Sequence, residues 1–228
     1  MSRGIEGNVE SLKDSSIKQP ESFIGKLEES TTVEKPDSFK EKEVTSNSVD
    51  NVESNQVKSV DGKFEEAELK RQLEKVNPYY EFFEECVINC QRCVPTFEMR
   101  CRGRDVIVLP ANYYDDFNPD SLSHYPFAVW ENPEIIACKG NGREDIENHM
   151  EKWGDGARAE ICVCWKNTDS GHVFVAEQVD GKTRYYDPQN GSTDVSHYFK
   201  QVELDSVQVC RIDNLDFSDR IKECCKEV

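Results

Sequence analysis

The chain has 228 residues and a formal net charge of −17, from 28 basic and 45 acidic side chains. Such a surface repels the phosphate backbone of DNA or RNA, and no basic stripe interleaved with aromatic residues offsets it, so no nucleic acid partner is expected. No apolar run approaches the roughly 18 residues that a membrane span needs, and the N-terminus shows no basic segment followed by an apolar one. We therefore expect no membrane association, no signal peptide and a cytoplasmic location.

Composition divides the chain into two parts. Residues 1–76 contain no Cys, Trp or Tyr and are dense in Ser, Glu, Lys and Asn. Such a segment buries too little apolar surface to offset the conformational entropy lost on folding. We expect residues 1–62 to form a disordered or linker tail and residues 63–228 to form one domain.

The domain shows helical patterns first and strand patterns second. Asn77-Pro78 and Gly103 are typical of helix ends, and Ser218 is a candidate N-cap for the last helix. This order predicts the α+β class, with N-terminal helices packed on an antiparallel β-meander. The expected helices are 63–76, 91–102, 143–153 and 218–227, and the expected strands are 105–109, 160–166, 172–179, 182–187 and 206–212.

A β-hairpin is the clearest local prediction. Asp180-Gly181 is a favoured type I′ turn dipeptide between two runs rich in β-branched and aromatic residues. With these two residues in the turn, Val179 faces Lys182, and His172 and Asp187 become diagonal cross-strand neighbours, about 7–8 Å apart at the backbone. A histidine held by a carboxylate forms two thirds of a nucleophilic triad.

The chain offers a thiol upstream. Cys90 and Cys93 lie at the start of the predicted helix 91–102. A cysteine at a helix N-terminus lies at the positive end of the backbone dipole, which favours the thiolate. Free N–H groups in the first helical turn can hold an oxyanion. A cysteine on a helix, a histidine on a strand and an aspartate on the next strand form the papain-type arrangement.

Four stretches of the sequence carry a more specific resemblance. They are the runs from Asn89 to Val106, Gly154-Asp-Gly-Ala-Arg158, Gly171-His-Val-Phe174 and Asp187-Pro-Gln189. In this order they resemble the papain-fold toxin family, the glutamine-deamidase or cysteine-hydrolase domains of polymorphic toxins and some phage head-associated proteins. The resemblance covers roughly residues 77–227 and implies a papain-like cysteine-hydrolase fold.

The resemblance also implies roles for individual residues. A cysteine of the 90/93 pair would be the nucleophile, His172 the general base and Asp187 the group that orients it. Asn89 and Gln189 would be the nearby polar contacts for substrate or oxyanion. The implied reaction is hydrolysis of an amide, a glutamine side chain or a peptide bond of a protein substrate, with no cofactor and no metal. A cognate immunity protein and non-classical delivery into a target cell are further expectations.

The choice between the two cysteines stays open at this point. Pro95 favours Cys93, because a helix capped by Asn89 would carry the proline at its sixth position, where it costs ~3 kcal/mol. The resemblance favours Cys90, because related hydrolases set the nucleophile directly after Asn or Asp.

Two alternatives to a deamidase also remain. The first is another papain-like protein, either a protease of the same fold or an inactive binding module of a mobile element. The inactive module is favoured by the several cysteines around the site, which are unusual next to one reactive thiolate. The second is a zinc site built from Cys90, Cys93, Cys162 and Cys164. The placement of Cys162 and Cys164 on one face of a strand buried on both sides argues against zinc.

Overall fold

The structure is a computed structural model that describes residues 65–111 and 117–228. The predicted tail, residues 1–62, and its boundary with the domain lie outside the described residues. Along residues 65–111 and 117–228, none of the helices combines the length and the apolar character that crossing a membrane requires.

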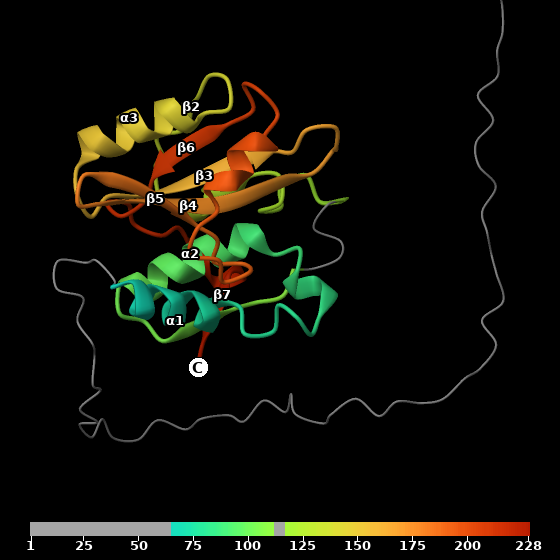
Figure 1. Cartoon of the computed structure of the whole chain (residues 1–228). Coiled ribbons are helices and arrows are strands. Elements are labelled where there is room, and N and C mark those ends of the chain that lie inside the picture. Colours follow the sequence, from blue (N-terminus) through green and yellow to red (C-terminus); the bar gives the residue numbers. More distant parts are fainter. Residues whose placement is uncertain (1–64, 112–116) are drawn as a thin grey trace, which may run out of the picture. The chain divides into compact units, whose positions relative to one another are not determined.

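A five-stranded antiparallel sheet forms the centre of the domain, with the strand order β2-β6-β3-β4-β5. Strands β3, β4 and β5 follow one another as the predicted meander, and β6 and β2 extend the sheet from the other side of β3 (Figure 1). The strands are β2 (Ile136–Ala137), β3 (Arg158–Cys164), β4 (Gly171–Val179), β5 (Lys182–Tyr186) and β6 (Gln208–Arg211).

The hairpin of β4 and β5 forms as predicted. Val179 pairs with Lys182, and both turn residues have positive φ, 51° at Asp180 and 71° at Gly181. A type I′ turn requires this backbone conformation at both of its central positions. The hairpin prediction is therefore confirmed in position and in register.

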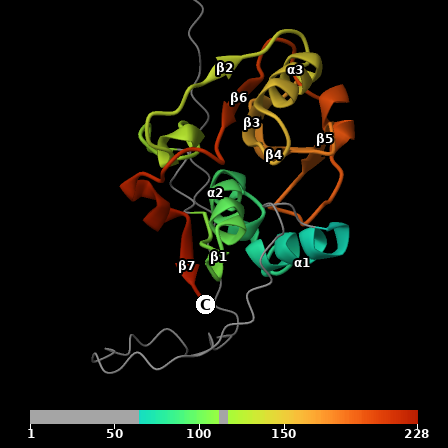
Figure 2. The same ribbon diagram turned by 90° about the vertical axis from the view of Figure 1, so that its left-hand side faces the viewer.

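Helices cover both faces of the sheet. Helices α1 (Glu66–Val76) and α2 (Cys90–Cys101) pack on one face, and α3 (Arg143–Trp153) packs on the other (Figures 1 and 2). Strand β3 serves both cores, because Ile161 and Val163 face the α3 side whereas Cys162 packs on the α2 side. The sheet is thus buried on both faces, as the continuous apolar run at residues 161–165 predicts.

The expected helix at 218–227 is wrong. Residues Asp219–Glu223 form a short 3₁₀ helix, which the Ser218 side chain caps by accepting a hydrogen bond from the N–H of Arg220. The chain then continues as strand β7 (Cys225–Glu227), which pairs antiparallel with β1 (Val106–Val108). The partner strand lies more than a hundred residues away in the sequence, so this pairing overrides the local helical pattern.

A buried ion pair ties α2 to the sheet. The carboxylate of Glu98, 0% exposed, accepts hydrogen bonds from Nε (2.7 Å) and Nη2 (2.9 Å) of Arg158 and from Nε (2.9 Å) of Arg102. Arg158 begins β3, so this contact fixes the position of α2 on the sheet.

We expect Glu98→Ala to lower the free energy of unfolding by about 3–5 kcal/mol, because it removes the buried carboxylate that pairs with the guanidinium of Arg158. Glu147→Ala is the matched control, since Glu147 pairs with Arg143 on the exposed side of α3 and such pairs contribute only about 0.3–0.5 kcal/mol. Urea denaturation of the two variants measures the difference. Equal losses would mean that the buried pair does not anchor α2.

A second buried carboxyl predicts a dependence of stability on pH. Glu160 on β3 is fully buried, and its Oε2 accepts a hydrogen bond from Nε1 of Trp130 at 2.7 Å. Burial raises its pKa from 4.5 to about 8, although the bond from Trp130 opposes the rise. Between these two pKa values the folded chain holds a proton that the unfolded chain has released, so stability falls as pH increases through this range.

Glu160→Gln keeps the hydrogen-bonding shape and removes the titration. We expect the free energy of unfolding of the wild type, relative to Glu160→Gln, to fall steadily as the pH rises from 4.5 to 8. Urea denaturation of both proteins across this range provides the measurement. A constant difference would contradict a protonated Glu160 in the folded state.

Candidate active site

Cys90 is the first residue of α2. The backbone carbonyl of the preceding Asn89 accepts hydrogen bonds from the N–H groups of Arg92 (2.9 Å) and Cys93 (3.1 Å). The N–H groups of Cys90 and Gln91 have no acceptor within the helix, because the first N–H groups of a helix point out of its end. The partly buried Cys90 thiol therefore lies in the positive field of the helix N-terminus.

The helix begins one residue earlier than predicted and contains Pro95. The argument that this proline forces a later start is wrong. Proline has no N–H, so the carbonyl of Gln91 loses its helical donor, a local cost of ~3 kcal/mol. The buried packing of α2 and the Glu98–Arg158 ion pair outweigh this local cost.

His172 and Asp187 meet as the hairpin predicts. His172 is the second residue of β4, Asp187 directly follows β5, and His172 Nε2 lies 2.8 Å from Asp187 Oδ2. Asp187 is 0% exposed and accepts two further hydrogen bonds, from the hydroxyl of Tyr198 (2.9 Å) and from the backbone N–H of Gln189 (2.8 Å). The carboxylate is thus held from three directions and fixes the plane of the imidazole.

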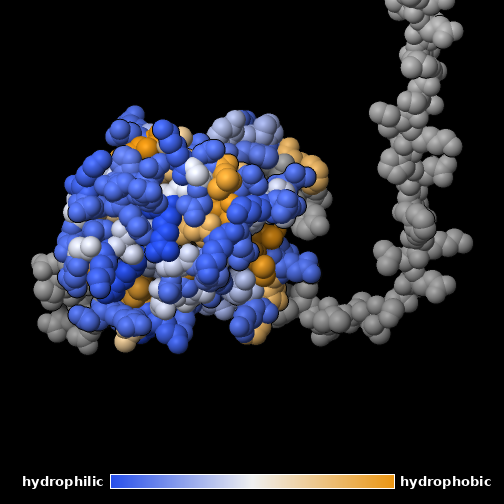
Figure 3. Space-filling model, turned by 45° about the horizontal axis from the view of Figure 1, so that its top comes forward, coloured by the Kyte–Doolittle hydropathy of each residue, from blue (hydrophilic) through white to orange (hydrophobic). Residues whose placement is uncertain are grey.

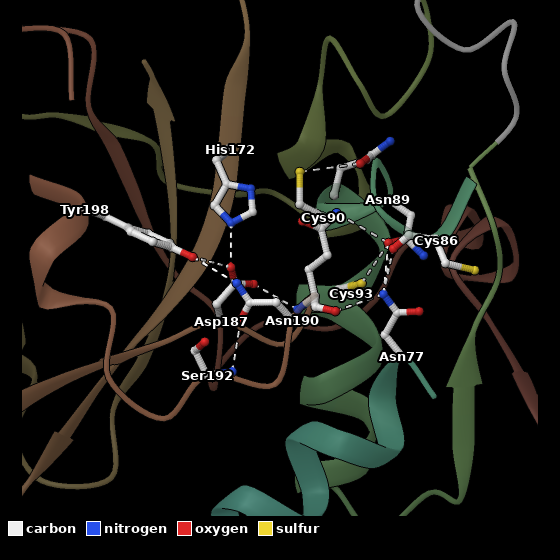
Figure 4. Close-up of polar contacts among 12 residues, drawn as sticks. Asn77, Cys86, Asn89, Cys90, Cys93, His172, Asp187, Asn190, Ser192 and Tyr198 are labelled. Atoms are coloured by element: carbon white, nitrogen blue, oxygen red, sulfur yellow. Dashed lines mark hydrogen bonds and ion pairs between the residues drawn. The ribbon is translucent and has the colours of Figure 1, made fainter. Parts of the chain in front are cut away.

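The other edge of the imidazole faces Cys90 (Figure 4). His172 pairs with Val163 and belongs to the α3 face of the sheet, whereas Cys90 comes from α2 on the opposite face. The two residues meet where β4 begins. Burial alone would lower the pKa of His172, but its hydrogen bonds to Asp187 and Cys90 raise it to about 10. The site therefore favours a protonated imidazole between Asp187 and Cys90.

Cys93 has a different environment. Its side chain is 0% exposed, and its Sγ–H donates a hydrogen bond to Asn89 Oδ1 at 3.3 Å. Burial raises the pKa of the Cys93 thiol well above its ordinary value, and the nearby Cys90 and Asp187 add to the rise. This thiol is held in its neutral form inside the protein.

Comparison with known proteins agrees with this arrangement. Residues 88–192 match the family model described as papain fold toxin 1, glutamine deamidase. This segment is therefore similar to the papain-fold toxin family. The matched span contains Cys90, His172 and Asp187, and the α+β class predicted from the sequence is confirmed. No curated protein matches the chain. Glutamine deamidases are hydrolases of the side-chain amide, so the family relation indicates a hydrolase.

Asn89 and Gln189 lie inside the papain-fold domain, and the expectation that they contact substrate is not supported by their positions. Asn89 is 0% exposed; its Nδ2 donates to the carbonyl of Leu109 (3.3 Å), and its Oδ1 accepts from Gln189 Nε2 (3.4 Å) and Asn77 Nδ2 (3.3 Å). Asn77 Nδ2 also donates to the carbonyl of Gln189 at 2.9 Å. These amides join α1, α2 and the segment after β5, and so support the site from within (Figure 4).

Sequence analysis missed three residues of the site. Tyr198 bonds Asp187 and packs edge-on against the His172 ring, with centroids 5.7 Å apart, and Trp165 stacks on the same ring at 5.7 Å with an interplanar angle of 23°. Tyr198 comes from a 3₁₀ helix (Ser196–Lys200) that no local pattern places near the hairpin. Trp165 directly follows β3, and its N–H donates to the carbonyl of Ser170, the residue before β4. Its place beside the predicted turn at residues 167–171 was the available signal in the sequence.

Gln91 is the third missed residue. Its Oε1 lies 3.6 Å from the Cys90 Sγ, which donates, and its Nε2 donates to Ser123 Oγ at 3.1 Å. The amide therefore orients the thiol and links α2 to the segment at 121–125.

An open hollow of about 430 Å³ lies beside the site. Trp165 forms one of its walls and connects it to His172, and its other lining residues are Lys166, Thr168, Lys200 and Gln201.

The zinc alternative finds no matching cluster. Across the described residues, no three His, Cys, Asp or Glu side chains are grouped so that they could hold a metal ion. Cys162 packs on the α2 side, where burial raises its pKa to about 12, whereas Cys164 is exposed at the end of β3. Among the described residues, these thiols therefore do not form a zinc-binding set.

The two thiols of the Cys90/Cys93 pair should differ sharply in reactivity. We expect iodoacetamide near neutral pH to modify Cys90 faster than the exposed Cys164, since an imidazolium partner enriches the reactive thiolate. Cys93 should stay unmodified in the folded protein because it is buried and neutral. Peptide mapping by mass spectrometry after timed exposure measures all three rates.

The matched variant is His172→Ala. It should slow modification of Cys90 to the rate of Cys164 and leave Cys164 unchanged. Equal rates at Cys90 and Cys164 in the wild type, or a fast rate that survives His172→Ala, would contradict the pairing of thiol and imidazole.

Proposed function

We propose that this protein is a thiol-dependent amide hydrolase that deamidates glutamine side chains of proteins. Cys90 is the nucleophile, His172 the acid and base, and Asp187 the residue that orients the imidazole. The supporting observation is the imidazole itself, bonded through Nε2 to Asp187 at 2.8 Å and interacting with Cys90 at its other edge. The match of residues 88–192 to a glutamine deamidase family narrows the amide to a glutamine side chain.

The reaction proceeds in two halves. The Cys90 thiolate attacks the carboxamide carbon, and the protonated His172 gives its proton to the departing nitrogen, so that ammonia leaves and a thioester remains. His172, now neutral, then takes a proton from water as the water oxygen attacks the thioester. The carbon–sulfur bond breaks, the proton returns to sulfur through the imidazole, and a glutamate side chain is released.

Stabilisation of the two oxyanions falls to the helix terminus. The N–H groups of Cys90 and Gln91 have no acceptor within α2 and lie at the residue that carries the nucleophile. Backbone donors fixed in this way can stabilise negative charge on the former carbonyl oxygen without rearranging. They replace the side chains of Asn89 and Gln189 in this role, because both amides are engaged inside the protein.

The environment of each thiol supports Cys90 over Cys93 as the nucleophile. Cys90 is partly exposed at the helix end and interacts with His172, whereas Cys93 is buried and donates its proton to Asn89. A protein substrate can reach only the first of these positions without unfolding α2.

The toxin family further implies a cognate immunity protein as a second partner.

Substitution of the three proposed catalytic residues should separate their roles. We expect Cys90→Ala to reduce ammonia release from lysate proteins by about 10⁴-fold or more, and Asp187→Asn to reduce it by about 10³–10⁴-fold, because the imidazole loses its orienting carboxylate. The measurements are a coupled assay of ammonia and peptide mapping of glutamines converted to glutamates.

Cys164→Ala is the control for loss of an accessible thiol and should retain full activity. Cys164 is exposed and pairs with Gly171, which turns its side chain to the face of the sheet opposite His172. Cleavage of lysate proteins in place of ammonia release would assign a peptidase of the same fold. If the lysate proteins neither release ammonia nor are cleaved, the result would favour a papain-like binding module. Undiminished activity of Cys90→Ala would refute the assignment of the nucleophile.

A further inference from the structure

An exposed surface of aromatic and acidic side chains leads directly into the nucleophile. It comprises residues 79–88, which connect α1 to α2, and is called here the aromatic-acidic surface. Phe82 is 73% exposed and Phe83 57%, and Tyr79, Val87 and Ile88 are also exposed. The face of the domain in Figure 3 is largely hydrophilic, with apolar side chains confined to a few areas. Five large apolar residues exposed within ten positions therefore indicate a surface that binds a partner.

The backbone beneath this surface is fixed. Cys86 is buried in the middle of the segment, and its carbonyl accepts a hydrogen bond from Asn77 Nδ2 at 2.8 Å. The carbonyl of Glu85 accepts another from the N–H of Ala111 at 2.8 Å, and the rings of Tyr79 and Phe83 pack edge-to-face at 5.9 Å. The exposed rings are thus presented by an ordered support, so a partner that binds them loses little additional chain entropy here.

The surface lies beside the site. Ile88 is two residues before Cys90, and Asn77, which holds the Cys86 carbonyl, also bonds Asn89 and the Gln189 carbonyl. A protein chain resting on this surface would therefore lie next to the residue that carries the thiol.

Charge determines the kind of partner. The segment carries Glu81, Glu84 and Glu85 and no basic residue, and residues 77–228 together hold 28 acidic and 16 basic residues, a net charge of −12. Aromatic faces attract ammonium and guanidinium groups, and neighbouring carboxylates strengthen this attraction. Acidic segments and phosphate backbones are repelled by the same charges.

We propose that the aromatic-acidic surface docks the protein substrate and selects one whose target glutamine lies next to Lys, Arg and apolar side chains. The inference rests on the proposed function for the identity of the occupant as a substrate. The surface itself is argued from exposure, charge and position, and can be tested without catalysis.

The binding test uses the full chain carrying Cys90→Ala and two fluorescent peptides of equal length, each with one glutamine. In the first peptide, Lys, Arg and Leu flank the glutamine; in the second, Glu and Leu flank it. We expect the first peptide to bind at least about tenfold more tightly in fluorescence anisotropy, and this difference to shrink with added salt. Equal affinities for the two peptides would overturn the proposal.

Variants locate the binding. The pair Phe82→Ser and Phe83→Ser, and separately the triple change of Glu81, Glu84 and Glu85 to Lys, should each remove the preference for the basic peptide. Both sets lie on exposed positions, so folding is preserved. Leu204→Ser and Glu151→Lys are matched controls, exposed elsewhere on the domain, and should leave binding unchanged. A preference that survives both sets of changes would overturn the proposal.

Activity separates this inference from the proposed function. With Cys90 intact, ammonia release from the basic peptide should be faster than from the acidic one, and the surface variants should equalise the two rates. Equal release from both peptides by the wild type would contradict the docking surface and leave the hydrolase standing. Selective binding with no ammonia from either peptide would contradict the hydrolase and leave the docking surface standing.

A second copy of the chain is the competing occupant. In that case the wild type would be a dimer in light scattering, the Phe82→Ser and Phe83→Ser pair would make it monomeric, and the peptides would bind equally. That combined result would overturn docking of substrate at this surface.

Discussion

The antiparallel register of β4 and β5 is the constraint on which the site depends. The turn at Asp180-Gly181 fixes which residues face each other, and His172 and Asp187 lie at the far end of that ladder. A slip of one residue would turn the side chain of Asp187 to the opposite face of the sheet. The distance of 2.8 Å between imidazole and carboxylate is therefore set by backbone pairing far from the chemistry, together with the bond from Tyr198.

The thiol of Cys90, the third group of the site, comes from the opposite face of the sheet. Cys90 belongs to α2, so its position relative to His172 depends on where this helix lies on the sheet. The buried ion pair between Glu98 and Arg158 fixes that position. The aromatic-acidic surface is held to the start of the same helix by the hydrogen bonds of Asn77 to the Cys86 carbonyl and to Asn89. Chemistry and the proposed recognition of substrate thus share one rigid support at the start of α2.

Local patterns predicted the parts of this fold that local interactions determine. The hairpin has its turn dipeptide and alternating strands, and the helix at 143–153 has Gly154 at its end, so both were correct. The parts that failed depend on distant segments. Strand β7 forms because β1 needs a partner, Tyr198 reaches Asp187 through tertiary packing, and α2 tolerates Pro95 because its buried face is anchored. Likewise, sequence alone placed Asn89 next to the thiol but could not tell that its amide points inward.

The amide oxygen of Asn89 is shared among competing donors. An amide oxygen has two lone pairs, yet three groups approach Oδ1. The two amide donors are at long distances, 3.3 Å for Asn77 and 3.4 Å for Gln189, and the Cys93 thiol lies at 3.3 Å. The thiol of Cys93 is the weakest of these donors, which leaves the oxygen available to the two amides. A hydroxyl at this position would compete more strongly and displace Gln189, whose backbone N–H helps to hold Asp187. The weak hydrogen bond from the Cys93 thiol to Asn89 therefore leaves Gln189 in place, where its backbone N–H holds the carboxylate of Asp187.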